Sequence, residues 1–188
     1  MTRESHRPLP RVHARRERKP ARLFKVEQLD LEFSNGERRT YERLVSRGLG
    51  GVIVVAMPDD DHVLLIREYA CGFHRYELCL PKGRLESGET ALEGAHRELQ
   101  EECGYGARDL VSLGPLTMAP GYMTHSTEIV LARDLYPSRL DGDEPEELEV
   151  LTWPLDDLVS LVQREDCSEG RSIAAVYMAR DLVRRGQV

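Results

Sequence analysis

Apolar and polar residues alternate along residues 23–33 of the chain, and this pattern predicts a β-strand. Residues 38–46 are expected to return as its antiparallel partner. Asn35-Gly36 lies between them, and this dipeptide is typical of a type I′ hairpin turn with two positive φ values. Because an isolated hairpin is marginally stable in water, it must pack on the rest of the chain or on another chain.

Six further apolar segments predict the strands of a larger unit. Their ranges are 52–57, 63–69, 76–80, 110–116, 127–135 and 149–155. Two later segments have apolar residues three and four positions apart, which indicates amphipathic helices. These residues are Leu155, Leu158, Val159 and Val162 in the first segment, and Val176, Ala179 and Val183 in the second.

A third helix is expected over residues 91–103. Thr90 and Glu93 have the spacing of a capping box at its start, and Gly104 supplies a residue that ends it in the left-handed conformation. Strands, one inner helix and two outer helices predict the α/β (α+β) class, with a mixed sheet between helices.

Length and charge limit the remaining possibilities. The 188 residues allow one full-sized core with a small appended unit. The formal charge is −7, but the first 20 residues carry +5 and the remainder −12. Residues 1–20 are therefore expected to form a basic, disordered leader. A basic tail can contact nucleic acid or an anionic membrane, and the solvated leader is the preferred interpretation.

Other function classes receive no support from the sequence. No apolar run approaches the ~18 residues of a membrane-spanning helix, and the N-terminus lacks the apolar centre of a secretory signal, so we expect a cytoplasmic protein with no membrane partner. The four cysteines form no C-x-x-C pair. Neither a zinc cluster nor a disulfide framework is indicated, and reduced thiols are expected.

Three carboxylates crowd one face of the helix expected at 91–103. Glu98, Glu101 and Glu102 are spaced at i, i+3 and i+4, so their like charges repel one another. A solvated acidic face is one explanation. A bound divalent cation is the other, because Mg²⁺ prefers carboxylate oxygens and a dication turns repulsion into shared attraction. Arg97 and the loop containing Gly83 and Glu89 favour a site over a solvated face.

The spacing of these residues resembles the signature of the Nudix hydrolases. The matching residues are Gly83, Glu89, Arg97-Glu98-Leu99, Glu101-Glu102, Gly104 and Tyr105, where an aliphatic residue is commoner at the last position. The resemblance implies an α/β/α sandwich over residues 49–188. It also implies hydrolysis of nucleoside diphosphates linked to another moiety, with Mg²⁺ or Mn²⁺ as cofactor.

The resemblance also implies roles for matched residues. Glu98, Glu101 and Glu102 are expected to be metal ligands, together with the backbone carbonyl of Lys82 beside the flexible Gly83. Arg97 is expected to orient a glutamate through a bidentate bond. Glu89 is expected to be either a further ligand or only the partner of Arg97; Leu99 is expected to serve packing.

The acidic segment 141–149 is the second candidate for chemistry. Taken alone, it is typical of a solvated turn. In the enzymes it resembles, the corresponding loop brings a glutamate over the metals to activate water. Glu144 is the first candidate for this base, and Glu146 is a further metal ligand or a substitute base.

Features outside the signature resemble the ADP-ribose pyrophosphatase branch of the family. Pro120 lies sixteen positions after Gly104. Residues 21–48 resemble the N-terminal sheet unit that is exchanged across a homodimer in that branch. The resemblance to hydrolases of ADP compounds implies that ADP-ribose, NADH and diadenosine triphosphate are cleaved to release AMP. Lys82 replaces a small residue common in the branch, which weakens the case for strict ADP-ribose preference.

Four residues are candidates for substrate binding. Arg67 and Glu68, at a strand end, could contact the phosphates, the ribose or the adenosine. Phe24 and Arg43, in the hairpin unit, could stack on adenine if a dimer places them near the partner's cleft. Surface pairing or packing is the alternative role for all four.

Two alternative functions remain at this stage. A nucleotide-sensing binding protein would commonly lack some of the signature glutamates, and this chain has all of them. Another Nudix activity, such as RNA 5′-pyrophosphohydrolysis, is disfavoured by the hairpin unit and Pro120. The basic leader keeps RNA open as a partner, although nucleic acid is not the expected one.

Overall fold

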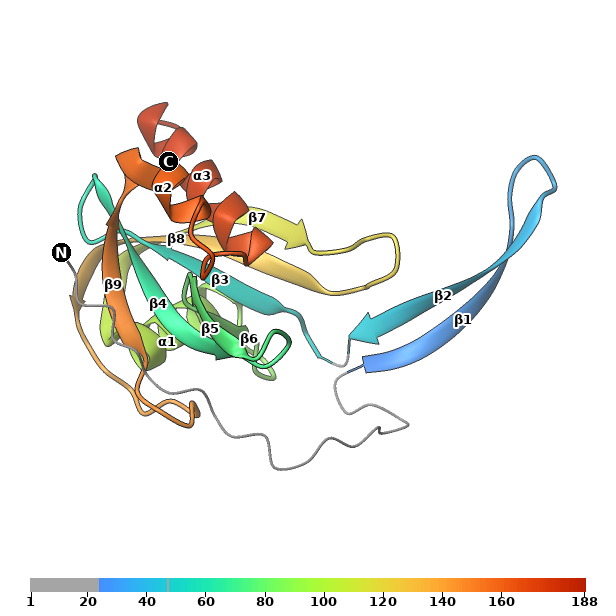
Figure 1. Ribbon diagram of the computed structural model, residues 1–188, viewed down its shortest axis with the longest axis horizontal. Coiled ribbons are helices and arrows are strands. Elements are labelled where there is room, and N and C mark those ends of the chain that lie inside the picture. The colour runs from blue at the N-terminus through green and yellow to red at the C-terminus, as the bar shows by residue number, and fades with distance from the viewer. Residues whose placement is uncertain (1–23, 47) are drawn as a thin grey trace.

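The computed structural model describes residues 24–46 and 48–188. The leader expected at 1–20 lies outside the described residues. Figure 1 shows a layered body and, beside it, a long two-stranded arm. Within the described ranges, no helix combines the length and the apolar character that crossing a bilayer requires. The expected cytoplasmic location and the proposed domain boundaries stay predictions.

The arm is the antiparallel hairpin predicted from the alternating N-terminal pattern. It consists of β1 (Phe24–Glu32) and β2 (Arg38–Ser46). Its base joins the body through Leu44, whose N–H donates to the Tyr122 carbonyl at 2.7 Å and whose carbonyl accepts from the Thr124 N–H at 3.0 Å. The remainder of the arm extends away from the body (Figure 1).

The predicted type I′ turn of the arm is wrong. Gly36 has a φ of 84°, but Asn35 does not have a positive φ. The Phe33 N–H instead donates to the Glu37 carbonyl at 2.8 Å, so the loop is wider than a two-residue turn. The Asn35 side chain accepts from the Glu37 N–H at 3.1 Å. This local bond offers Asn35 an alternative to the left-handed conformation.

The body contains the mixed sheet structure that the sequence predicted. Its described strands are β3 (Gly51–Ala56), β4 (His62–Ala70), β5 (Arg75–Cys79), β6 (Lys82–Arg84), β7 (Tyr105–Thr117), β8 (Ser126–Pro137) and β9 (Glu149–Pro154). They form sheets with the orders β6-β3-β8-β7 and β5-β4-β9. Only β3 and β8 pair in parallel among these strands. The three-residue β6 was not predicted, because so short a strand leaves no periodic signal.

Helices cover both faces of the strands. Helix α1 (Ala91–Cys103) packs on the face that contains Val52 and Val54 of β3. Helices α2 (Leu158–Val162) and α3 (Gly170–Arg184) pack on the opposite face with Ile53 and Val55, as Figure 1 shows. Adjacent residues of β3 therefore serve two cores, which is why its sequence is continuously apolar. The predicted α/β/α sandwich is confirmed.

The helix expected from Leu155 to Val162 is partly wrong. A 3₁₀ turn at Leu155–Asp157 precedes the five-residue α2, and Val159 is 59% exposed. Leu161 is buried in its place. A 3₁₀ turn has about 3.0 residues per turn instead of 3.6, so it rotates the following residues out of the α-helical phase.

The ends of α1 are those the sequence predicted. The Glu93 carboxylate accepts from the Thr90 N–H at 2.8 Å, and the Glu93 N–H donates to the Thr90 hydroxyl at 3.3 Å. Gly104 ends the helix with a φ of 75°, and its N–H donates to the Gln100 carbonyl. These caps fix which residues of α1 face the strands.

Candidate active site

A cleft of about 870 Å³ lies where α1, β6 and the acidic loop 141–148 meet. Its lining includes Glu68, Lys82, Arg97, Glu98, Glu101, Glu102, Glu144 and Glu146. Glu98 and Glu102 are buried, at 8% and 6% exposure. Residues far apart in sequence thus line one cleft.

Arg97 organises the carboxylates at one side of the cleft. Its guanidinium forms a bidentate pair with Glu89, at 2.9 and 3.1 Å. The third nitrogen, Nη1, donates to Glu98 and Glu101, each at 2.8 Å. A planar guanidinium with five donors suits this arrangement, whereas a lysine could not hold three carboxylates in fixed directions. Glu89 is therefore the partner of Arg97 in this structure.

The backbone of β6 lies against the two buried carboxylates, Glu98 and Glu102. The Lys82 N–H donates to Glu102 Oε2 at 2.8 Å. The Glu98 carboxylate lies directly against Gly83, where any Cβ would overlap it. A glycine is required here because of this close approach, not because of an unusual φ.

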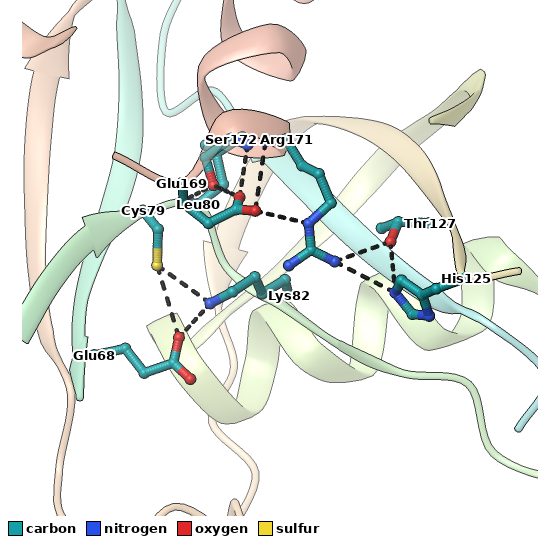
Figure 2. A network of polar contacts seen from close by, with 9 residues as sticks. All are labelled: Glu68, Cys79, Leu80, Lys82, His125, Thr127, Glu169, Arg171 and Ser172. Atoms are coloured by element: carbon teal, nitrogen blue, oxygen red, sulfur yellow. Dashed lines mark hydrogen bonds and ion pairs between the residues drawn. The ribbon is translucent and has the colours of Figure 1, made fainter. Parts of the chain in front are cut away.

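The side chain of Lys82 is committed to a different partner. Figure 2 shows its ammonium beside Glu68 and Cys79. The ammonium pairs with the Glu68 carboxylate and lies 3.2 Å from Cys79 Sγ. Lys82 thus joins two walls of the cleft: its side chain pairs with Glu68 on β4, and its backbone N–H donates to Glu102 on α1. No sequence pattern indicated the Lys82–Glu68 pair, which joins residues on different strands.

Helix α3 supports the chain that enters β6. The Leu80 N–H donates to the Ser172 hydroxyl at 3.0 Å, and Glu169 accepts from the Ser172 N–H at 2.8 Å. Figure 2 shows Arg171 extending from Glu169 to Thr127 and His125 on the neighbouring strand and loop. This network fixes the backbone just before Lys82.

Burial changes the proton affinity of the glutamates on α1. Desolvation raises the pKa of Glu98, and raises that of Glu102 well above its ordinary value although Lys82 partly offsets it. The pKa of Glu89 is lowered, chiefly by its hydrogen bond with Arg97. A buried anion is costly, so Glu98 and Glu102 are the carboxylates that gain most from a nearby cation.

The acidic loop presents two different glutamates. Glu144 has no hydrogen bond or ion pair with the described residues, and desolvation of its carboxylate at the cleft, then the charges of Glu68 and Asp143, raise its pKa. Glu146 accepts a hydrogen bond from the Tyr76 hydroxyl at 2.5 Å. Tyr76 and Asp143 were missed by sequence reasoning, because a strand aromatic and one acid among many carry no distinguishing pattern.

The donor set of the cleft suits a hard divalent cation. Glu98 and Glu102 supply buried carboxylates beside a backbone that has no Cβ at Gly83, which leaves room for close approach. Within the described residues, however, no three acidic, histidine or cysteine side chains already form a compact ligand cluster. Arg97 and the Lys82 N–H face the carboxylates instead. The assignments of Glu98, Glu101, Glu102, Glu146 and the Lys82 carbonyl as ligands stay predictions.

Not all candidate substrate-binding residues lie in the cleft. Glu68 does, whereas Arg67 donates to Glu149 at 3.0 Å and to Asp166 at 2.6 Å outside the lining. Arg43 lies on the arm and donates to Glu27 at 2.7 Å. The side chain of Phe24 lies outside the described residues. Two further cleft residues, Arg84 and Arg139, were not predicted.

Comparison with known proteins defines the class. Residues 49–175 match the NUDIX domain, so the chain belongs to the Nudix family and is a Nudix hydrolase. Residues 10–43 match the NudE-type Nudix hydrolase N-terminal domain. The predicted family, enzyme class and fold are confirmed.

Individual known proteins are similar to this chain over most of its length. The chain is 48% identical over 161 residues to the ADP compounds hydrolase NudE of Escherichia coli (strain K12), covering 86% of each protein. It is 28% identical to the ADP-ribose pyrophosphatase of Bacillus subtilis (strain 168), covering 78% of this chain and 80% of that protein. A crystal structure of an ADP compounds hydrolase superimposes with a TM-score of 0.79 at 47% identity, covering 89% of this chain and 91% of the other.

Proposed function

We propose that this Nudix hydrolase cleaves the pyrophosphate bond of ADP-linked compounds and releases AMP. ADP-ribose, NADH and diadenosine triphosphate are the proposed substrates. The similarity to an ADP compounds hydrolase and to an ADP-ribose pyrophosphatase supports this substrate class. The single observation that carries the proposal is the cleft in which Arg97 fixes Glu89, Glu98 and Glu101.

The proposed cofactor is Mg²⁺ or Mn²⁺, held by Glu98, Glu101, Glu102 and the Lys82 carbonyl. Oxygen ligands of this kind suit both ions. When bound, the ion neutralises diphosphate charge and lowers the pKa of the attacking water. Arg97 keeps the glutamate side chains in their directions, and the Gly83 backbone leaves the space that Glu98 occupies.

Glu144 is the proposed general base. It lines the cleft and has no partner among the described residues, so its carboxylate can accept a proton from water. Its raised pKa brings it closer to neutral pH, which is the range in which a general base is efficient. Attack at the adenosine-side phosphorus releases AMP and a phosphorylated remainder.

The proposed active form is a homodimer joined through the arm. Val26, Phe33 and Tyr41 of the arm are exposed at 62%, 46% and 46%. A two-stranded ribbon with such apolar surface gains stability by packing on another chain. An exchanged arm would also bring Phe24 and Arg43 toward the partner's cleft, where they are proposed to stack on adenine. Glu68 is the proposed substrate contact within the cleft itself. A contact between Arg67 and the substrate stays a prediction, and it would require Arg67 to exchange its bonds with Glu149 and Asp166.

Product analysis tests the proposal. Purified enzyme with Mg²⁺ or Mn²⁺ is incubated with ADP-ribose, NADH, diadenosine triphosphate and 5′-capped RNA, and the products are separated by chromatography. Comparable AMP release from the first three substrates is the expected result. Preferential cleavage of capped RNA would replace the proposal with the RNA-directed alternative, and cleavage of none would refute it.

A further inference from the structure

A tyrosine on β5 binds the loop that carries both candidate glutamates. The Tyr76 hydroxyl donates to Glu146 Oε1 at 2.5 Å, across 70 positions of sequence. This is a short distance for a hydroxyl and a carboxylate, as is usual when the acceptor is charged. We infer that Tyr76 is a positioning residue that makes Glu146 the anchor of the acidic loop and thereby holds Glu144 at the cleft. The inference rests on the proposed function, in which Glu144 is the base.

The strand that carries Tyr76 is well fixed. Tyr76 lies opposite Tyr69 in the β4–β5 pair, with ring centroids 5.9 Å apart. The next residue along β5, Glu77, is buried and accepts from the Ser168 N–H at 2.9 Å. A hydroxyl on such a strand is a rigid point of attachment.

The loop needs an attachment of this kind. Residues 141–145 are all exposed and have no regular secondary structure. The Leu140 N–H donates to the Gln100 carbonyl at 3.3 Å before the loop, and Leu148 packs against the α1 core after it. Glu68, Asp143 and Glu146 place like charges near Glu144. Their mutual repulsion favours movement of a free loop away from the cleft.

The position of the loop matters for the distance between Glu144 and α1. A Cβ at Gly142 would lie 3.5 Å from Cβ of Glu101, so the loop passes close to the helix that carries the proposed ligands. A shift of the loop moves Glu144 relative to those carboxylates. General-base catalysis requires hydrogen-bond reach to the water, and a displacement of about 1 Å can cost up to about 100-fold in rate.

The two glutamates therefore have separate tasks in this inference. Glu144 keeps its carboxylate free for proton transfer, whereas one oxygen of Glu146 is occupied by Tyr76. A glutamate that only anchors the loop needs an oxygen that accepts the Tyr76 hydroxyl, but it does not need a negative charge. A glutamate that accepts the proton from water or binds the metal needs both the oxygen and the negative charge.

Tyr76→Phe tests the tether, because it removes the hydroxyl and keeps the ring. We expect kcat to fall about tenfold with the substrate KM within about twofold, since the base and not the binding site is displaced. Amide hydrogen exchange of residues 141–148, measured without substrate, should become faster. Tyr69→Phe is the matched control: its hydroxyl bonds His74 and not the loop, so kcat and loop exchange should not change.

Glu146 variants separate an anchor from a base or ligand. Glu146→Gln keeps an oxygen that can accept from Tyr76, so it should retain about ten times more activity than Glu146→Ala. The double variant Tyr76→Phe with Glu146→Ala should have the same kcat as Glu146→Ala alone, because each substitution removes the same Tyr76–Glu146 hydrogen bond.

Three results would contradict either the Tyr76 tether or the proposed function. Unchanged kcat and loop exchange in Tyr76→Phe would overturn the inference, and so would equal losses in Glu146→Gln and Glu146→Ala. Faster loop exchange in Tyr76→Phe, in an enzyme that cleaves no ADP-linked compound, would support the tether and refute the proposed function.

Discussion

Gly83 shows how a single missing side chain shapes the cleft. Its Cα faces the Glu98 carboxylate, which occupies the volume that any Cβ would need. Arg97 then holds Glu98 from the other direction, at 2.8 Å. The position of Glu98 thus depends on the missing side chain of Gly83 and on the guanidinium of Arg97. The sequence analysis singled out Gly83 and Arg97, but it did not predict the contact between Gly83 and Glu98.

Gly83→Ala should separate function from stability. The obstructed atoms belong to the flexible end of Glu98, so the glutamate should move while the backbone of β6 stays in place. We expect activity and Mn²⁺ affinity to fall by more than about tenfold with little change in melting temperature. Gly72→Ala, where nothing lies near the added Cβ, should leave both unchanged. Normal Mn²⁺ affinity in Gly83→Ala would exclude Glu98 as a ligand.

Glu102→Gln should lower turnover by orders of magnitude and raise stability in chelator. The folded pKa of Glu102 lies above its unfolded value, chiefly because of burial. Such a group adds stability at low pH and loses it as pH rises through the folded pKa. In EDTA at pH 8 the variant should therefore melt at a higher temperature than the wild type, and the difference should shrink toward pH 4. Near-normal activity with Mg²⁺ would reject the ligand role.

Glu144→Gln should reduce kcat by about 10²-fold or more and weaken Mn²⁺ binding far less. Because desolvation and, after it, the neighbouring acids Glu68 and Asp143 raise the pKa of Glu144, the rate should fall as pH drops through that raised pKa. Asp143→Asn removes one of these charges and should lower the pKa of Glu144. The acidic limb of the kcat–pH profile of this variant should therefore lie at lower pH than that of the wild type. An unchanged rate in Glu144→Gln would transfer the base to Glu146.

At the scale of elements, local signals were reliable where they act over a single turn. The capping box at Thr90 and the glycine end at Gly104 set the bounds of α1 as expected. The segment from Leu155 failed, because a 3₁₀ turn changed the phase and left Val159 exposed. The hairpin was correct but its turn was not, since the Asn35 side chain bonds the backbone.

Thr90→Ala should destabilise the protein by about 1 kcal/mol, the usual effect of losing a helix N-cap. The Thr90 hydroxyl accepts the Glu93 N–H, and among the described residues no other side chain is a cap there. Thr90→Ser keeps the hydroxyl and should lose much less. Urea denaturation measures both variants, and equal stabilities would show that the cap contributes nothing.

At the scale of the whole molecule, the arm is the least self-sufficient part. It is attached near Leu44 and otherwise extends from the body with apolar side chains exposed (Figure 1). A globular domain has no need of such a ribbon for its own core. The homodimer that the resemblance implied stays a prediction, and the arm is the surface on which it depends.

Val26→Asp should weaken self-association. Val26 is 62% exposed in the arm, so a charge there costs the single chain little but is unfavourable in an apolar interface. Size-exclusion chromatography with light scattering should show a dimer for the wild type and a shift toward monomer for the variant. Val159→Asp, at a similarly exposed 59% on α2, should remain dimeric. A monomeric wild type at micromolar concentration would refute the dimer.

The sequence by itself determined the acidic helix, its caps, the positions of most strands along the chain and the family. These features depend on spacings within a few residues, which the chain shows directly. Only the tertiary structure decided that Lys82 pairs with Glu68, that Tyr76 holds Glu146 and that Arg67 turns away from the cleft. Those contacts join residues 14 to 99 positions apart, so they depend on how strands and loops come together in space.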